Sequence, residues 1–138
     1  MSTLTPEQLD MIKRLQPFFK EKMGEWQVGD EFYNEVVGEL GAVHKIHADG
    51  LECFYYEGGV GFIGYRNIDN KLLRIPKPID WQNPERGLWG MITSSYKTIE
   101  TFPRKTIITV GIDPTYKEFD AADPFTALLT TLCEQERV

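Results

Sequence analysis

Two histidines and two cysteines are the side chains of this chain best suited to metal or nucleophilic chemistry. His44 and His47 lie three residues apart on a predicted strand, so side-chain alternation places them on opposite faces. They cannot easily ligate one metal in that arrangement, and Cys53 shares a face with His44 but not with His47. Cys53 and Cys133 have no spacing typical of a zinc site or a disulfide frame. We therefore expect no metal site and no cofactor.

Nucleophilic and phosphate-binding motifs are also incomplete. Ser94 and Ser95 have no G-x-S-x-G signature around them. The glycine-rich stretch 58–64 lacks the G-K-[ST] ending of a phosphate loop and is followed by no predicted helix. The 21 acidic residues allow too many carboxylate pairs for any one pair to be informative. We predict no catalytic residue, and an enzyme or ligand binder whose polar groups converge only in three dimensions stays open as the alternative.

An aromatic and basic group surrounds a predicted turn at Asn83-Pro84. Trp81, Arg86 and Trp89 are residue types enriched in binding hot spots, and irregular segments often carry function. In a second interpretation, both tryptophans plug the end of the sheet and Arg86 pairs locally. We predict these three residues as part of an interaction surface.

Helices are predicted at both ends of the chain. Thr5-Pro6-Glu7-Gln8 is a capping-box start, Pro17 predicts a kink or break, and Gly24 predicts the end. Asp123-Pro124 begins the last helix. Its apolar side has the spacing i, i+3, i+4, i+7, at Phe125, Leu128, Leu129 and Leu132.

A three-strand meander is predicted over 42–48, 51–57 and 60–66. Asp49-Gly50 and Gly58-Gly59 suit two-residue turns, in which both positions need positive φ. This predicts three cross-strand pairs, namely Ala48 with Leu51, His47 with Glu52 and Ile46 with Cys53. Side-chain alternation then defines two apolar faces. The first contains Ile46, Leu51, Cys53, Tyr55 and Phe62, and the second contains Val43, Phe54, Tyr56, Ile63 and Tyr65, with Lys45, His47 and Glu52 near one end.

The remaining segments complete an α+β prediction. We predict an edge strand within 26–33, a short strand over 72–75, about one helical turn after Asn83, and a hairpin of 98–102 with 105–112. The expected fold is one domain over residues 1–138, with an antiparallel sheet of about five strands and both terminal helices packed on its first face. Later segments or another subunit would cover the second face, so Phe54, Tyr56 and Tyr65 are predicted interaction residues.

Charge and hydropathy limit the partners. A net charge of −6 disfavours general binding to phosphate backbones, so we expect no nucleic-acid partner. The weakest alternative is a basic stripe of Lys71, Arg74 and Lys77 with Arg104 and Lys105. No apolar run reaches the length of a membrane span, and residues 1–10 lack a signal-peptide pattern, so we expect no membrane partner and a cytoplasmic location.

Three segments together resemble small uncharacterised proteins encoded in bacterial genomes and their phages or prophages. They are Thr5-Pro6-Glu7-Gln8 with residues 26–30, the stretch 75–91 (IPKPIDWQNPERGLWGM), and the closing residues 127–136. That family has no assigned activity, so the resemblance implies no catalytic residue. It implies a phage-linked accessory role. We expect a non-enzymatic protein that acts through protein contacts, with another protein or as a homodimer.

Overall fold

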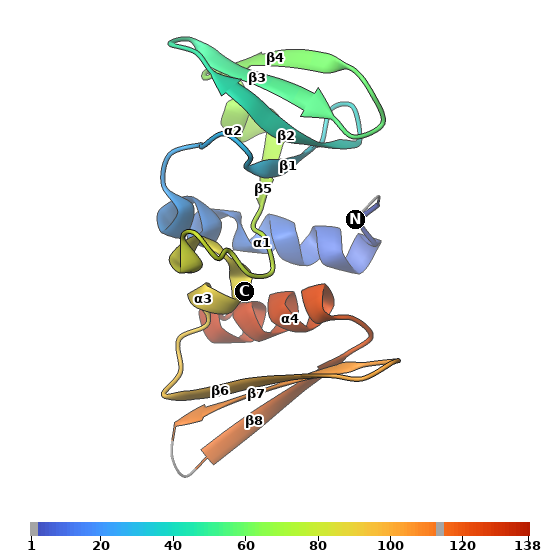
Figure 1. The fold of residues 1–138 in the computed structure, drawn as a ribbon, viewed down its shortest axis with the longest axis vertical. Coiled ribbons are helices and arrows are strands. Elements are labelled where there is room, and N and C mark those ends of the chain that lie inside the picture. The colour runs from blue at the N-terminus through green and yellow to red at the C-terminus, as the bar shows by residue number, and fades with distance from the viewer. Residues whose placement is uncertain (1–2, 113–114) are drawn as a thin grey trace. The chain divides into compact units, whose positions relative to one another are not determined.

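The computed structural model describes residues 3–112 and 115–138 (Figure 1). Its contacts divide the chain into two compact units, residues 1–76 and 77–138, each with its own sheet. Helices and antiparallel strands occur in both units, which confirms the α+β class. That the chain forms one domain stays a prediction.

Helix α1 (Pro6–Met23) opens the first unit with the predicted capping box. The Thr5 hydroxyl oxygen accepts a bond from the Gln8 amide at 3.1 Å, and the Gln8 side chain accepts one from the Thr5 amide at 3.0 Å. The helix continues through Pro17 instead of breaking there, and the buried Leu15 and Phe19 anchor it on both sides. It ends before Gly24, which has φ 68° and donates to the Lys20 carbonyl.

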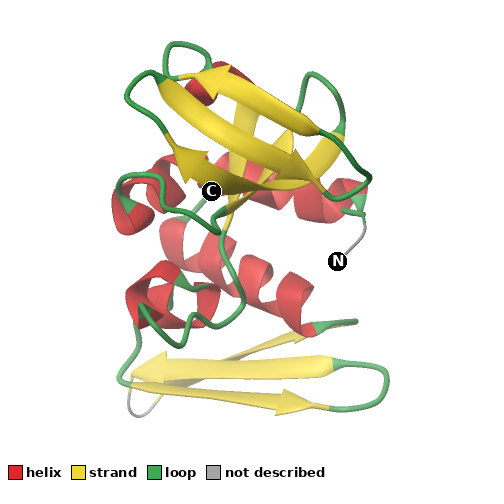
Figure 2. Cartoon of the chain, turned by 45° about the horizontal axis from the view of Figure 1, so that its top comes forward, coloured by secondary structure: helices red, strands yellow, loops and turns green. Residues whose placement is uncertain are grey.

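A five-stranded antiparallel sheet forms the rest of the first unit (Figure 2). Its strands are β1 (Glu31–Asn34), β2 (Glu39–Ile46), β3 (Gly50–Tyr55), β4 (Val60–Gly64) and β5 (Leu72–Ile75), with the short helix α2 (Ile68–Lys71) before β5. The spatial order is β4-β3-β2-β1-β5, so β4 and β5 are the two edges. The five-stranded antiparallel sheet is thus confirmed.

The turn between β2 and β3 differs from the prediction. Gly50 lies inside β3 and pairs with Gly64, so the connection is residues 47–49 and not a two-residue Asp49-Gly50 turn. A Cβ at Gly50 would lie 2.7 Å from the Phe62 ring, so glycine serves close strand packing here. Ile46 pairs with Leu51 and Lys45 with Glu52, which makes the three predicted cross-strand pairs wrong.

The turn between β3 and β4 is longer than predicted, although its glycines behave as expected. Gly58 and Gly59 have φ of 109° and 103°, but the connection spans residues 56–59 and Phe54 lies opposite Val60. This register moves Phe62 to the outer face of the sheet and Ile63 to the inner face. Both predicted face assignments are therefore wrong.

A β-bulge between Val43 and Lys45 changes the faces on β2. The register shifts there, so Val43 pairs with Cys53 on the inner face, not on the outer face as predicted. The inner-face core receives Ile68 from α2 and is closed by Trp26 and Tyr55. Its buried members are Phe32, Val43, Leu51, Cys53, Ile63, Ile68 and Leu72.

The second unit has its own sheet and its own helix. It contains the 3-10 turn η1 (Pro84–Arg86), α3 (Leu88–Met91), β6 (Tyr96–Thr101), β7 (Thr106–Ile112), β8 (Thr115–Ala121) and α4 (Pro124–Glu136). The β6–β7 hairpin matches the predicted one within a few residues, whereas β8 was not predicted. Helix α4 begins at the Asp123 cap as expected and packs against β7, β8 and α3. Its four predicted apolar residues are buried, but their partner is this three-stranded sheet and not the meander, because β8 completes a second apolar surface.

Candidate functional site

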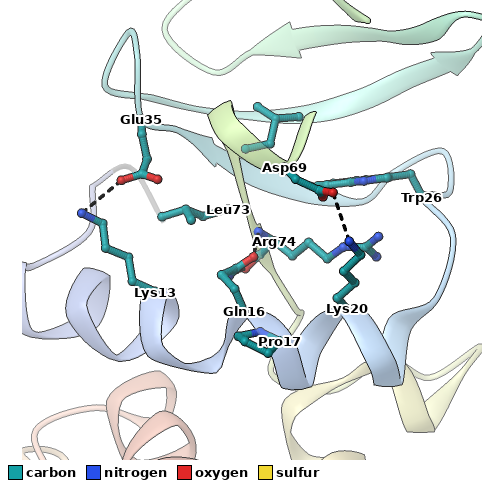
Figure 3. A pocket seen from close by; sticks show the side chains of 10 residues that line it. Lys13, Gln16, Pro17, Lys20, Trp26, Glu35, Asp69, Leu73 and Arg74 are labelled. Atoms are coloured by element: carbon teal, nitrogen blue, oxygen red, sulfur yellow. Dashed lines mark hydrogen bonds and ion pairs between the residues drawn. The ribbon is translucent and has the colours of Figure 1, made fainter. Parts of the chain in front are cut away.

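A cleft of about 590 Å³ lies in the first unit between α1 and the β5 side of the sheet (Figure 3). Figure 3 shows two lysines of α1 reaching across it, Lys13 to Glu35 and Lys20 to Asp69. Both ion pairs have a nitrogen-to-oxygen distance of 3.0 Å. All four side chains are substantially exposed, so each pair contributes at most about 1 kcal/mol.

Arg74 is the third cation of the cleft and is buried. Its guanidinium carbon lies 4.4 Å from the centre of the Trp26 ring, a stacked cation–π contact. Three cations and two carboxylates line the cleft, which leaves one positive charge in excess. Because Arg74 is packed against Trp26, it does not stand on the surface as a member of the basic stripe considered above.

The free edge of β5 is bonded by a side chain of α1. Gln16 donates from Nε2 to the Arg74 carbonyl at 2.9 Å and accepts from the Arg74 amide at 2.8 Å through Oε1. The side-chain amide thus bonds the backbone of an edge strand as a neighbouring strand would. We call this pair of bonds the Gln16 clamp.

The outer face of β2, β3 and β4 carries a row of contacting side chains that we call the aromatic strip, made of His44, His47, Glu52, Phe54 and Phe62. The His44 and Phe54 ring centres lie 4.2 Å apart, and those of His47 and Phe62 lie 5.9 Å apart. Both imidazole rings reach Glu52, with Nε2-to-carboxylate distances of 3.6 Å for His44 and 3.4 Å for His47. The His47 and Glu52 side chains therefore meet, although Lys45 and not His47 lies opposite Glu52 in the register of the strands.

The bulge is the reason that both histidines reach one carboxylate. Regular alternation would separate His44 from His47, and the prediction that they point to opposite faces is wrong because the register shifts between Val43 and Lys45. Within residues 3–112 and 115–138, however, no group of three or more His, Cys, Asp or Glu side chains is placed to hold a metal ion.

The predicted residues Phe54, Tyr56 and Tyr65 are all about half exposed. Tyr56 donates its hydroxyl to Glu31 at 2.9 Å, and desolvation, followed by this bond and the charge of Glu31, raises the pKa of its phenol. Tyr65 donates to the His47 carbonyl at 2.9 Å, beside the strip. Sequence reasoning missed Phe62 as an exposed residue because the assumed two-residue turn placed it on the inner face.

Trp81, Arg86 and Trp89 do not form one exposed surface in the second unit. Trp81 is 86% exposed, whereas Arg86 is buried at 7%. Trp89 is partly buried beneath Lys97, whose ammonium lies 4.7 Å from its ring centre. Lys97 also donates to the carbonyls of Trp89 and Ile92 at 2.7 and 3.0 Å, and so supplies hydrogen bonds to carbonyl groups at the C-terminal end of α3.

The nucleophile candidates have structural roles. Cys53 is fully buried, and burial together with the charge of Glu52 raises the pKa of its thiol to about 11, so it is not a thiolate at neutral pH. The Ser94 hydroxyl lies 2.6 Å from the Tyr96 carbonyl and 2.7 Å from the Gly111 carbonyl, and accepts a bond from the Gly111 amide at 3.0 Å. It joins β6 to β7.

Comparisons with protein-family models, with curated proteins and with solved structures give no match. Among the residues that the structure describes, no helix combines the length and the apolar character that crossing a bilayer requires.

Proposed function

We propose that this protein is a non-enzymatic, phage- or prophage-associated accessory protein that binds another protein through the aromatic strip. One observation carries the proposal. Phe54 and Phe62 are 45% and 53% exposed on the same face of a sheet whose other face is a closed core. Contiguous exposed apolar side chains of this kind are typical of interaction sites. The phage association comes from the resemblance of the sequence segments.

The side chains of the strip support one another, because each phenyl ring is packed beside an imidazole ring and both imidazoles lie within 3.6 Å of the Glu52 carboxylate. Ordered aromatic side chains lose little conformational entropy on binding, which favours their use as anchors.

The chemistry of the partner follows from the charges around the strip. Lys45 is exposed on the same face, where it pairs with Glu52 in the register of β2 and β3. We therefore infer a protein partner that offers an apolar patch flanked by carboxylates, which would meet the two phenyl rings and the Lys45 ammonium.

Site-specific photo-crosslinking in prophage-induced bacterial cells tests the proposal. A photoreactive phenylalanine analogue is placed at Phe54, at Phe62 and, as a matched control, at Phe102, which is 44% exposed in the second unit. We expect positions 54 and 62 to share a discrete adduct with one partner protein and position 102 to give none.

The purified partner is then titrated against Lys45→Glu and Phe54→Ser variants. We expect each variant to weaken binding about tenfold or more, since one reverses the charge and the other removes an anchor. Equal crosslinking from all three positions, or unchanged affinity in both variants, contradicts the proposal.

The cleft supports a second candidate function, the binding of a small anion. Its excess positive charge contrasts with the acidic chain as a whole. Orthophosphate and benzoate are suitable probes, titrated at low ionic strength while the Trp26 indole signal is followed by NMR. Saturable shifts that weaken in Lys20→Gln would support this function, and shifts that are linear in ligand concentration would remove it.

A further inference from the structure

Strand β4 is an open sheet edge without the protection that the other edges have. The opposite edge, β5, is occupied by the Gln16 clamp. In the three-stranded sheet, the edge strands carry charged residues, Lys97 and Glu100 on β6 and Lys117, Glu118 and Asp120 on β8. Strand β4 reads Val-Gly-Phe-Ile-Gly, with no charge and no proline. Charges and covering groups are the usual means by which proteins prevent edge pairing.

The hydrogen-bond pattern shows which residues of β4 face the open edge. The Tyr55 amide donates to the Gly59 carbonyl and the Tyr65 amide donates to the Asp49 carbonyl, each at 3.1 Å. Antiparallel bonding alternates along a strand, so the odd-numbered residues of β4 bond β3. The amide and carbonyl groups of Val60, Phe62 and Gly64 therefore point away from the sheet.

We propose that a second copy of this chain pairs with β4 in antiparallel orientation, on a two-fold axis through Phe62. Phe62 then faces Phe62 of the second copy, and Val60 faces Gly64 of the second copy at both ends. The Gly64 carbonyl already accepts the Asn67 amide at 2.9 Å, so this register joins the outward groups of Val60 and Phe62 and the Gly64 amide in about four backbone hydrogen bonds. A branched valine opposite a glycine avoids crowding on the outer face.

Charge complementarity favours this occupant and this orientation. Glu57 precedes β4 and Arg66 follows it, and both are exposed. Glu57 lies in the turn before β4 and Arg66 in the turn after it, so antiparallel pairing about Phe62 places Glu57 of each copy at the same end of the paired strands as Arg66 of the other. Parallel pairing would instead bring like charges together, which is unfavourable.

The dimer would also bring two aromatic strips together, a consequence that rests on the proposed function. Val60 and Phe62 have side chains on the same face as Phe54, so the two aromatic strips lie on one face of a continuous sheet. A partner with two binding patches would gain from both strips at once.

Charge reversal at the strand ends tests the pairing by sedimentation equilibrium on the full chain. The interface is short, so we expect a dissociation constant of about 10–100 µM for the dimer. Glu57→Arg or Arg66→Glu alone should weaken the dimer about tenfold, because two contacts change from attraction to repulsion. The double variant Glu57→Arg/Arg66→Glu should restore it.

Backbone participation is tested separately. Gly64→Pro removes an outward amide that β3 does not use, and should abolish the dimer, whereas Gly64→Ala keeps the amide and should retain it. In the unmodified chain, hydrogen-exchange protection of the Phe62 and Gly64 amides should rise with protein concentration.

A chain that remains monomeric at several hundred micromolar overturns the inference, as does a dimer in which the double charge variant is no tighter than the single ones. The proposed function fails by a different result. Loss of the dimer leaves crosslinking from Phe54 to a partner intact, and loss of partner binding in Phe54→Ser leaves the dimer intact.

Discussion

Removal of the Gln16 clamp should destabilise the first unit more than its position on an exposed helix turn suggests. In Gln16→Ala the amide and carbonyl of Arg74 lose their partners, and Arg74 is only 6% exposed. An unsatisfied buried polar group costs about 1–3 kcal/mol. The side chain of Gln16 is only partly buried, so water can replace part of the loss. We expect a decrease of about 2–3 kcal/mol in the free energy of unfolding.

The assay is urea unfolding followed by NMR signals of the first unit, with hydrogen exchange at the Arg74 amide. Gln16→Met keeps the volume of the side chain without its polar groups and should lose nearly as much stability as Gln16→Ala. Lys13→Ala is the control on the same helix, since it removes only the exposed ion pair to Glu35 and should cost less than about 1 kcal/mol. If both Gln16 variants lie within about 0.5 kcal/mol of the parent chain, or Arg74 exchange is unchanged, the clamp does not stabilise the edge.

Three further predictions concern other parts of the chain. Gly58→Ala and Gly59→Ala should each lower the free energy of unfolding by about 1–2 kcal/mol, because both glycines have positive φ, and Gly58→Asn should lower it less. Urea titration measures these changes, and unchanged stability in the alanine variants would contradict the turn geometry. Cys53 should resist iodoacetamide at pH 8 in the folded chain, because its thiol is buried and its pKa is about 11; peptide mapping that finds alkylation at the rate of a free thiol would disprove this. Burial lowers the pKa of Lys97, so the unfolded chain binds the proton more tightly. The stability of the second unit should therefore rise with pH between the pKa of folded Lys97 and the unfolded value near 10.4, and Lys97→Met should remove that rise. NMR titration of the Lys97 side chain measures the folded pKa, and a value at or above the unfolded one would show that burial does not lower it.

Local sequence signals predicted local structure well. The capping box of Thr5 and Gln8, the end at Gly24 and the Asp123 start are determined by bonds within a few residues, and all three are present. The faces of the meander were less predictable. One bulged residue, His44, and a longer connection before Val60 each shift the register, and neither has a signal distinct from the strand pattern around it.

The candidate sites show the same limit. Phe54 and Tyr56 were assigned to the second face of the meander, which another segment or subunit was expected to cover, and they are about half exposed in this chain. Phe62 was assigned to the wrong face because the predicted turn was too short. The Gln16 clamp joins residues 58 positions apart, and nothing in the sequence around Gln16 or Arg74 marks the pair. The strand β8 was missed because its three charged residues, Lys117, Glu118 and Asp120, interrupt the apolar pattern of a strand.

The clamp also determines how far association through β4 can go. A sheet with two free edges can add copies at both sides and grow into a fibre. In the five-stranded sheet the β5 edge is already bonded by Gln16, so if β4 pairs as proposed, this sheet offers one pairing edge and growth would stop after one addition. A single glutamine thus leaves the two edges of the sheet unequal, which favours a dimer over an open-ended polymer.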